Sequence, residues 1–340
     1  MTTQLVVDKP GVLASIQDLG RFGYRRFGVP QSGVLQPDFA KIANVLAGNP
    51  EDTAVIEFLL TGPTFHLANG SLRLAIAGDC YVKLTRHGDR RMFRAWRSIN
   101  LQAGDFLEIG NVLSGKAGYI AISGGFDLVP VMGSHATYLR AGFGGLDGNP
   151  LRAGTILPLK SKSATKGSNF FLPTPPLAEL PSSHQESIDR FGPATIHVIL
   201  GPQDDYFTEK ALRDFFHGVY TVTRESDRMG SRLEGPVLTH RPDMSSEIIS
   251  DGMVPGAIQV PGNGAPIVML ADGPTVGGYP KIATVISTDL PKLAVMTPGS
   301  MITFEEVTLE EAEARLQATK ERLTALLATI TPLPQISEPF

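Results

Sequence analysis

Hydrophobic residues along this chain fall mostly into short runs that are separated by glycine- and proline-rich turns. The clearest runs are LRLAIAGD (Leu72 to Asp79), AGYIAISGG (Ala117 to Gly125), ATIHVILG (Ala194 to Gly201), APIVMLADG (Ala265 to Gly273) and KIATVIS (Lys281 to Ser287). Short apolar runs bounded by turn-forming residues are typical of β-strands. The pattern therefore predicts a mostly β protein with few helices.

One early segment has the period of a helix instead. Between Leu35 and Pro50, apolar residues recur at the 3.6-residue spacing from Phe39 to Leu46, and the pattern stops at Gly48. Apolar spacing of this kind followed by glycine predicts a helix with a defined end. We expect a short helix that packs on a sheet or barrel.

The tail predicts a second helix. It begins with Thr308, and Glu311 follows three residues later, which is the spacing of a capping box. From Leu309 to Ile330 the apolar positions have a heptad-like 3,4 spacing. Two interpretations stay open: a helix that lies over its own domain, and a helix that faces a partner.

The best linker candidate runs from Leu159 to Pro193, where serine, proline and lysine replace the steady alternation. We place a domain boundary near residue 190, with a first domain at 1–190 and a second at 191–340 that includes the C-terminal helix. The first half contains LRLAIAGDC followed later by INLQAGDFLEIG, and the second half contains a weakly similar pair, IHVILGPQD followed later by AVMTPGSMITFEEV. This weak similarity is compatible with two similar halves and equally with chance.

Charge and composition narrow the class of partner. The chain has 340 residues, 42% of them hydrophobic, and a formal net charge of −4. These values argue against a nucleic-acid surface or a membrane-bound role and favour small molecules or proteins as partners. The single cysteine, Cys80, cannot form an internal disulfide, and MTTQLVVDKPG has no leader pattern, so we expect the cytoplasm.

The stretch ADGPTVGGYPKIATVIS, Ala271 to Ser287, has the composition of a binding loop. It lacks the spacing of a Walker phosphate loop, and a β-branched run follows its lysine where that motif needs a helix. The Gly277 and Gly278 pair would let backbone approach a ligand, while Tyr279 can stack and Lys281 carries a positive charge. A hairpin turn with a solvated lysine is the alternative.

Two nearby loops offer further polar contacts. Gln259 and Asn263, with Gly264 after it, suit recognition of an amide or lactam, although Asn-Gly is also a common hairpin turn. In SDRMGSRLEG, Arg228 and Arg232 can grip a carboxylate or phosphate. A solvated loop with internal salt bridges is equally compatible with that sequence.

The segment SIQDLGRFGYRRFGVPQSGVLQPD near the N-terminus is polar and glycine-rich, as loops that carry sites often are. Its candidate contacts are Gln17, Asp18, Arg21, Gln31, Ser32 and Asp38. The basic run RHGDRRMFRAWR, by contrast, predicts an exposed hairpin.

Several catalytic arrangements are not supported by the sequence. The seven histidines show no metal-ligand spacing, and no Gly-x-Ser-x-Gly elbow occurs. We therefore predict no metal site in this chain and no serine-type triad.

Four segments of the chain together resemble one family. They are DLGRFGYRRFGVPQSG, SDRMGSRLEG, GAIQVPGNGAPIVMLADGPTVGGYPKIATVISTDLPKLA and the TPGS turn before MITFEEV. This family contains KipA and the C subunit of 5-oxoprolinase, and it is also called the second subunit of allophanate hydrolase or the carboxyltransferase A/B domain. The resemblance runs from Val7 to about Glu306. It implies two tandem cyclophilin-like β-barrel domains and a partner of the KipI type, which is the B subunit of 5-oxoprolinase.

The resemblance implies three classes of function. The leading one is the C subunit of an ATP-dependent 5-oxoprolinase, a hydrolase that opens the lactam of 5-oxo-L-proline to L-glutamate together with its A and B subunits. The second is the carboxyltransferase subunit of a biotin-dependent urea or amide carboxylase, and the third is a non-catalytic regulator of the KipA type. ATP would be bound by the complex. Biotin would be carried by another chain, because no lysine here lies between two methionines.

Amide or lactam activation needs donors for a developing oxyanion and a cation for phosphate or carboxylate. From residue chemistry we assign the cation to Lys281, Arg228 or Arg232, and the donors to Gln259, Asn263 and the Gly277-Gly278 backbone. Asp272, or Asp18 from the N-terminal loop, is the candidate base.

Overall fold

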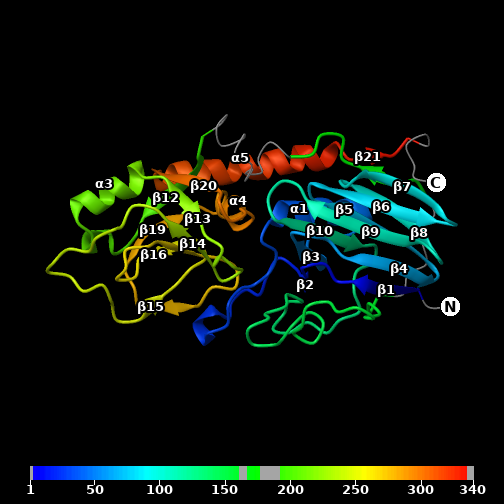
Figure 1. The fold of residues 1–340 in the computed structure, drawn as a ribbon, viewed down its shortest axis with the longest axis horizontal. Helices are drawn as coiled ribbons and strands as arrows, with labels where there is room; N and C mark the ends of the chain where they lie inside the picture. Colours follow the sequence, from blue (N-terminus) through cyan, green and yellow to red (C-terminus); the bar gives the residue numbers. More distant parts are fainter. Residues whose placement is uncertain (1–2, 161–166, 177–191, 335–340) are drawn as a thin grey trace. The chain divides into compact units, whose positions relative to one another are not determined.

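The computed structural model describes residues 3–160, 167–176 and 192–334, and the chain divides into two compact units. Of these residues, 3–21, 32–176 and 323–334 belong to the first unit, and 22–31 and 192–322 to the second. The boundary predicted near residue 190 lies outside the described residues. The prediction of a mostly β protein is confirmed, since strands dominate both units (Figure 1).

The first unit contains a five-stranded and a seven-stranded sheet, in the orders β1-β4-β9-β6-β7 and β2-β3-β10-β5-β8-β11-β21. All neighbours in both sheets are antiparallel, which suits the short connections between most consecutive strands. The strands are β1 (Gln4–Lys9), β2 (Leu13–Gln17), β3 (Val55–Leu59), β4 (Thr64–Asn69), β5 (Ser71–Ala77), β6 (Cys80–Arg86), β7 (Asp89–Arg94), β8 (Arg97–Gln102), β9 (Phe106–Val112), β10 (Ala117–Ile122), β11 (Phe170–Phe171) and β21 (Thr331–Pro332).

Helix α1 (Pro37–Ala47) packs on β10, β5 and β8 of the seven-stranded sheet (Figure 1). Its buried face includes Phe39, Ile42 and Leu46, the stripe predicted from the sequence. The helix ends at Gly48, whose φ of 80° is the left-handed conformation that glycine adopts readily at a C-terminus. The predicted short helix is therefore confirmed.

The second unit is a closed barrel of seven strands in the order β12-β19-β16-β17-β14-β13-β20. The ring closes through β20, which pairs parallel with β12 and antiparallel with β13. Its strands are β12 (Ala194–Leu200), β13 (Tyr220–Val222), β14 (Gly230–Glu234), β16 (Ala257–Gln259), β17 (Ile267–Met269), β19 (Lys281–Val285) and β20 (Met301–Glu306). A two-stranded ribbon of β15 (Asp251–Gly252) and β18 (Val276–Gly277) belongs to the same unit.

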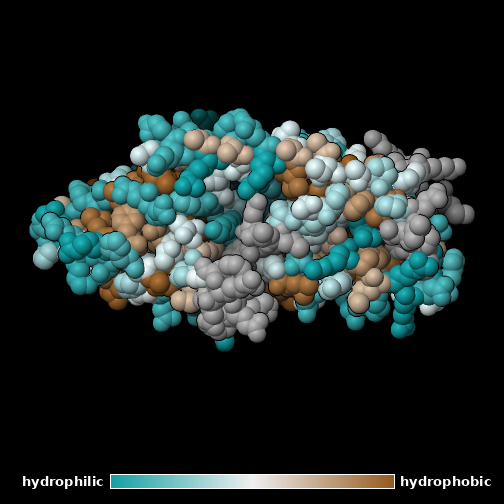
Figure 2. Space-filling model, turned by 90° about the horizontal axis from the view of Figure 1, so that it is seen from above, coloured by the Kyte–Doolittle hydropathy of each residue, from teal (hydrophilic) through white to brown (hydrophobic). Residues whose placement is uncertain are grey.

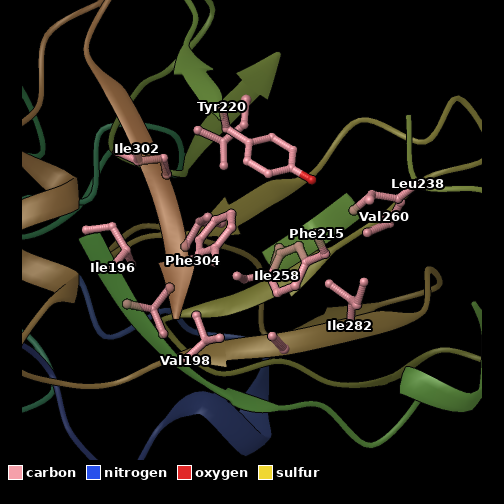
Figure 3. Packing of buried hydrophobic residues seen from close by; sticks show 14 of the residues in the cluster. Ile196, Val198, Phe215, Tyr220, Leu238, Ile258, Val260, Ile282, Ile302 and Phe304 are labelled. Atoms are coloured by element: carbon pink, nitrogen blue, oxygen red, sulfur yellow. The ribbon is translucent and has the colours of Figure 1, made fainter. Parts of the chain in front are cut away.

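The barrel has an apolar core that a helix not predicted from the sequence helps to fill. Helix α3 (Glu209–His217) packs against β20, and its Phe215 stacks on Phe304 with ring centroids 4.5 Å apart (Figure 3). The sequence pattern located helices only in the two segments above; α3 and the short α4 (Leu290–Ala294) were not located, although they fit the expected mostly β fold with a few short helices and a C-terminal helix. Two 3₁₀ turns, η1 (Arg25–Phe27) and η3 (Asp204–Tyr206), also belong to this unit.

Helix α5 (Leu309–Ala328) has the predicted capping box. Thr308 N–H donates to Glu311 Oε2 at 2.9 Å, and Glu311 N–H donates to Thr308 Oγ1 at 3.2 Å. Leu323 is the one buried side chain of the helix, and the face on which α5 lies is mostly hydrophilic, with hydrophobic residues in small scattered groups (Figure 2). None of the helices described is long and apolar enough to cross a membrane.

Candidate functional site

The glycine-rich loop from Ala271 to Ser287 lies where the β15–β18 ribbon meets the barrel wall. In the ribbon, Asp251 pairs with Gly277 and Gly252 with Val276. The backbone of Gly278 then accepts a hydrogen bond from Ile248 N–H at 2.8 Å. After this turn the chain enters β19 at Lys281, so the loop leads into a strand, as predicted.

Lys281 is the central charged residue of this region. Its side chain is only 6% exposed, and its Nζ donates to Asp251 Oδ2 at 2.5 Å and to the carbonyl oxygen of Gly252 at 3.3 Å. Its backbone N–H donates to Gln203 Oε1 at 3.2 Å. A buried ammonium needs a charged partner, and the ribbon supplies one. The lysine is therefore held, whereas the alternative from the sequence was a solvated side chain.

The partner carboxylate has the opposite exposure. The Asp251 side chain is 56% exposed. The hydrogen bond from Lys281 lowers the pKa of Asp251, with smaller contributions from the backbone N–H of Gly252 and from the lysine charge. Asp251 is thus ionised at neutral pH, and the pair offers a solvent-facing carboxylate in contact with a nearly buried ammonium.

A buried amide adjoins this pair. Gln259 is 5% exposed and donates from Nε2 to the carbonyl oxygen of Tyr279 at 3.3 Å. A Cβ on Gly277 would lie 2.3 Å from that Nε2, so any residue other than glycine would displace the amide. The sequence predicted that a ligand would approach this glycine closely. In the structure, the side-chain amide of Gln259 lies close to it instead. Tyr279 remains 38% exposed.

We call Lys281, Asp251, Gln259, Gly277 and Tyr279 the Lys281 cluster. It combines a cation, a carboxylate, an amide and a half-exposed phenol within one unit. These groups can donate to and orient a carbonyl compound.

Arg25 supports the ribbon from a distant part of the sequence. From η1 its Nη2 donates to the carbonyl oxygens of Met253 and Pro274. Met253 follows β15 and Pro274 precedes β18, so one guanidinium joins the two sides of the ribbon. Partial burial lowers the pKa of Arg25. Neither Arg25 nor Asp251 was selected from the sequence. Arg25 lies in the glycine-rich N-terminal segment that the sequence analysis identified, but no local spacing indicated its role.

Arg228 and Asp272 form a buried ion pair. Arg228 Nε donates to Asp272 Oδ2 at 2.8 Å, and the two side chains are 7% and 5% exposed. The backbone N–H of Asp272 also donates to the carbonyl oxygen of Arg228 at 3.0 Å. The pair joins two loops of the barrel, and the carboxylate selected as a candidate base is held by a guanidinium.

The remaining predicted contacts of the second unit lie in local structure. Asn263 Oδ1 accepts from Ala265 N–H at 3.1 Å, and Gly264 has a φ of 73°, so they form the turn between β16 and β17. This is the hairpin alternative for the Asn-Gly pair. Arg232 is exposed on β14, and Gln31 is partly buried.

Two of the N-terminal candidates, Asp18 and Arg21, make several hydrogen bonds within the first unit. Asp18 accepts from Gly20 N–H, Ser134 Oγ and His135 N–H at 2.5–2.9 Å. Arg21 is fully buried and donates to the carbonyl oxygens of Val131 and Ala136. Ser32 is 3% exposed with a φ of 56°. Gln17 is buried, and Asp38 lies in the first turn of α1. The structure thus brings together the predicted residues Lys281, Gln259, Gly277 and Tyr279.

No group of three or more histidine, cysteine, aspartate or glutamate side chains that could hold a metal occurs among residues 3–160, 167–176 and 192–334.

Comparison with known proteins gives a consistent result. The family model of the carboxyltransferase domain, subdomain A and B, matches residues 27–306 of the chain. The C subunit of the Escherichia coli 5-oxoprolinase is 34% identical over 309 residues, which are 91% of this chain and 93% of that protein. The C subunit of the Haemophilus influenzae 5-oxoprolinase is 34% identical over 311 residues, 91% of this chain and 92% of that protein.

A solved structure extends the comparison to a larger enzyme. The crystal structure of the Kluyveromyces lactis urea carboxylase matches with a TM-score of 0.82 and 28% identity. The match covers 98% of this chain but 30% of that one. The whole chain therefore resembles one part of the urea carboxylase, whereas it resembles almost the full length of the two 5-oxoprolinase subunits.

Replacing Lys281 by the uncharged, similarly shaped methionine should raise the pKa of Asp251 towards the ordinary carboxyl value of ~3.9. The reason is that Lys281 causes most of the lowering. The stability that the pair contributes is present above the ordinary carboxyl pKa and is lost as pH falls through the lowered value. A carboxyl-detected NMR titration measures the change. Lys292→Met is the control, because among the contacts described the Nζ of Lys292 donates only to the Thr195 carbonyl oxygen, at 3.0 Å. This substitution should leave the pKa of Asp251 unchanged.

Proposed function

The chain belongs to the family of the carboxyltransferase domain, subdomains A and B, and from this premise we propose that it is the C subunit of a 5-oxoprolinase. In this role it helps to open the lactam of 5-oxo-L-proline to L-glutamate as part of an ATP-dependent complex. The two 5-oxoprolinase relatives support the proposal because each is matched over more than nine-tenths of its length. The urea carboxylase is matched over 30% of its length.

The Lys281 cluster is the observation that carries the chemical part of the proposal. Attack of a nucleophile on the lactam carbonyl carbon places negative charge on the carbonyl oxygen before the ring C–N bond breaks. Lys281 supplies an ammonium whose position is fixed by Asp251 and Gly252, so little reorganisation is needed when the charge develops. The low exposure of Lys281 strengthens its interaction with that charge.

The other groups of the cluster have supporting roles in this proposal. Gln259 orients the lactam through its amide, which can both donate and accept. Asp251 fixes Lys281, and its lowered pKa makes it a weak base. Asp272 and Asp18, the bases expected from the sequence, are held by Arg228 and by three donors respectively. We therefore assign them to scaffolding, and we place the general base on another chain of the complex.

The Lys281 cluster does not have the features of a binding site for a nucleoside triphosphate. Its one ammonium is balanced by one carboxylate, and its glycine pair leads into β19 instead of the N-terminus of a helix. We propose that ATP binds elsewhere in the complex, on the A subunit or the KipI-like B subunit. We also propose that this assembly works in the cytoplasm, in keeping with the single cysteine.

The second candidate function is carboxyl transfer to urea or another amide. It is favoured by the match to the Kluyveromyces lactis urea carboxylase, which covers nearly all of this chain. In that case Lys281 would face a carboxylate, and biotin would be carried by another chain. Incubation with a biotinylated carrier, bicarbonate and urea, with carboxylated product as the readout, separates this function from lactam opening.

Reconstitution tests the leading proposal. The chain is combined with purified candidates for the A and B subunits, and ATP-dependent formation of glutamate from 5-oxo-L-proline is measured. We expect glutamate only when all three chains are present, because the chemistry is divided among them. Equal rates with and without this chain, or no glutamate from the complete mixture, would contradict the proposal.

Gly277→Ala tests whether the placement of Gln259 matters for activity. The added Cβ would meet the Gln259 amide at 2.3 Å and displace it, so we expect turnover of the complex to fall about tenfold, equivalent to ~1.4 kcal/mol. Gly252→Ala, on the paired strand, is the matched control because its Cβ would meet nothing within 4 Å and alanine keeps the backbone carbonyl oxygen that accepts from Lys281. Equal turnover of the two variants would remove Gln259 from the site.

A further inference from the structure

The two faces of the β15–β18 ribbon have opposite surroundings. Asp251 and its paired residue Gly277 face the barrel, where Asp251 contacts Lys281. Side chains alternate between the two sides of a strand, so Val276, next to Gly277, points away from the barrel, and it is 59% exposed. The pairing continues past β15, so Val254, three residues after Asp251, is on the same outward side and is 51% exposed. The outward face of the ribbon is therefore apolar and exposed.

Two further apolar side chains extend this face. The turn η1 lies beside the end of the ribbon, because Arg25 donates to the carbonyl oxygens of Met253 and Pro274 (Figure 1). Phe27 of η1 is 65% exposed, and Ile249, two residues before β15, is 95% exposed. All of these residues belong to the second unit. We call Phe27, Ile249, Val254 and Val276 the ribbon patch.

We propose that the ribbon patch is a docking surface for another chain of the complex, namely the chain that carries the general base. This inference rests on the proposed function, in which the base lies outside this chain, and it names the place where that chain binds. The docked chain covers the outward face of the ribbon, while Asp251 holds the inward face to Lys281. Assembly of the complex and the geometry of the Lys281 cluster then depend on the same element.

The size of the ribbon patch agrees with this role. With roughly 150–200 Å² for a fully exposed side chain of this kind, the four exposed fractions leave on the order of 400–500 Å² of apolar surface in water. A standard interface buries ~800 Å² on each partner, of which ~57% is apolar, or ~450 Å². The patch thus supplies about the apolar area that one side of a stable interface requires.

The chemistry of the Lys281 cluster decides which chain docks. The cluster has one ammonium and one carboxylate, and the lowered pKa of Asp251 makes that carboxylate a weak base. A second copy of this chain would bring a second Lys281 cluster and no better base. A different chain with a histidine or a carboxylate beside an apolar surface would bring the missing group. Ile249 of the patch is two residues from Asp251, whose side chain is 56% exposed, so a chain docked there borders the cluster.

Val276→Glu tests the docking surface, because it places a carboxylate within the ribbon patch. Purified candidates for the A and B subunits are each mixed with the full chain, and association is measured by biolayer interferometry. We expect Val276→Glu to raise the dissociation constant at least about tenfold, since docking would remove the new charge from water. Val237→Glu is the matched control, because Val237 is 65% exposed in the same unit and lies outside the patch. It should associate as the unaltered chain does.

A measurement on the unaltered chain does not depend on the folding of a variant. Addition of the subunit that binds should slow amide hydrogen exchange in residues 249–254 and 274–279. No association with either subunit, equal dissociation constants for Val276→Glu and Val237→Glu, or unchanged exchange in the ribbon would each overturn the inference. Self-association that Val276→Glu abolishes would make a second copy the occupant and would also overturn it.

Glutamate formation is measured on the same mixtures, which separates this inference from the proposed function. Failure of the proposed function appears as absent glutamate from the complete mixture. Failure of the docking surface appears as unchanged association or unchanged exchange, whether or not glutamate is formed.

Discussion

A nearly buried lysine ammonium must be neutralised, and this requirement organises the candidate site of the second unit. Lys281 begins a strand of the barrel wall, so its position is fixed by the closed ring of hydrogen bonds. Its charge is balanced by Asp251, which lies outside the wall on the β15–β18 ribbon. The pair therefore ties a small exposed ribbon to a rigid barrel, and it leaves the carboxylate facing solvent.

The other contacts of the region maintain this arrangement. Arg25 joins the two sides of the ribbon through the carbonyl oxygens of Met253 and Pro274. Gly277 has no side chain, so the Gln259 amide can lie against the ribbon. The Arg228–Asp272 pair fixes the loop that leads into this stretch. Each contact restricts the position of a polar group in or beside the Lys281 cluster, and donors fixed in advance are what electrostatic stabilisation of a transition state requires.

The fold could be predicted from the sequence where a local pattern is sufficient. Apolar runs indicated the strands, the 3.6-residue stripe indicated α1, and Thr308 with Glu311 indicated the start of α5. Helix α3 was missed because it has nine residues and buries only Ala211 and Phe215, too few positions to establish a period. Its place depends on stacking against Phe304, a contact that no local pattern contains.

The site could be predicted only in part, for the same reason. Glycine content and residue chemistry selected Lys281, Gln259, Gly277 and Tyr279. Asp251 lies 30 residues from Lys281, and Arg25 lies 228 residues from Met253, so folding alone brings these partners together. Asp272 was selected as a base because its charge is visible in the sequence, whereas its buried guanidinium partner is not.

In the proposed function, the Lys281 ammonium acts directly on the substrate. Its most direct test is the turnover of a reconstituted complex with Lys281→Met, compared with Lys292→Met. Loss of one fixed donor to a developing oxyanion typically lowers kcat by ~10²–10³-fold. We expect a loss of that size for Lys281→Met in a folded, assembled complex, and unchanged turnover for Lys292→Met. Equal turnover of the two variants would contradict it.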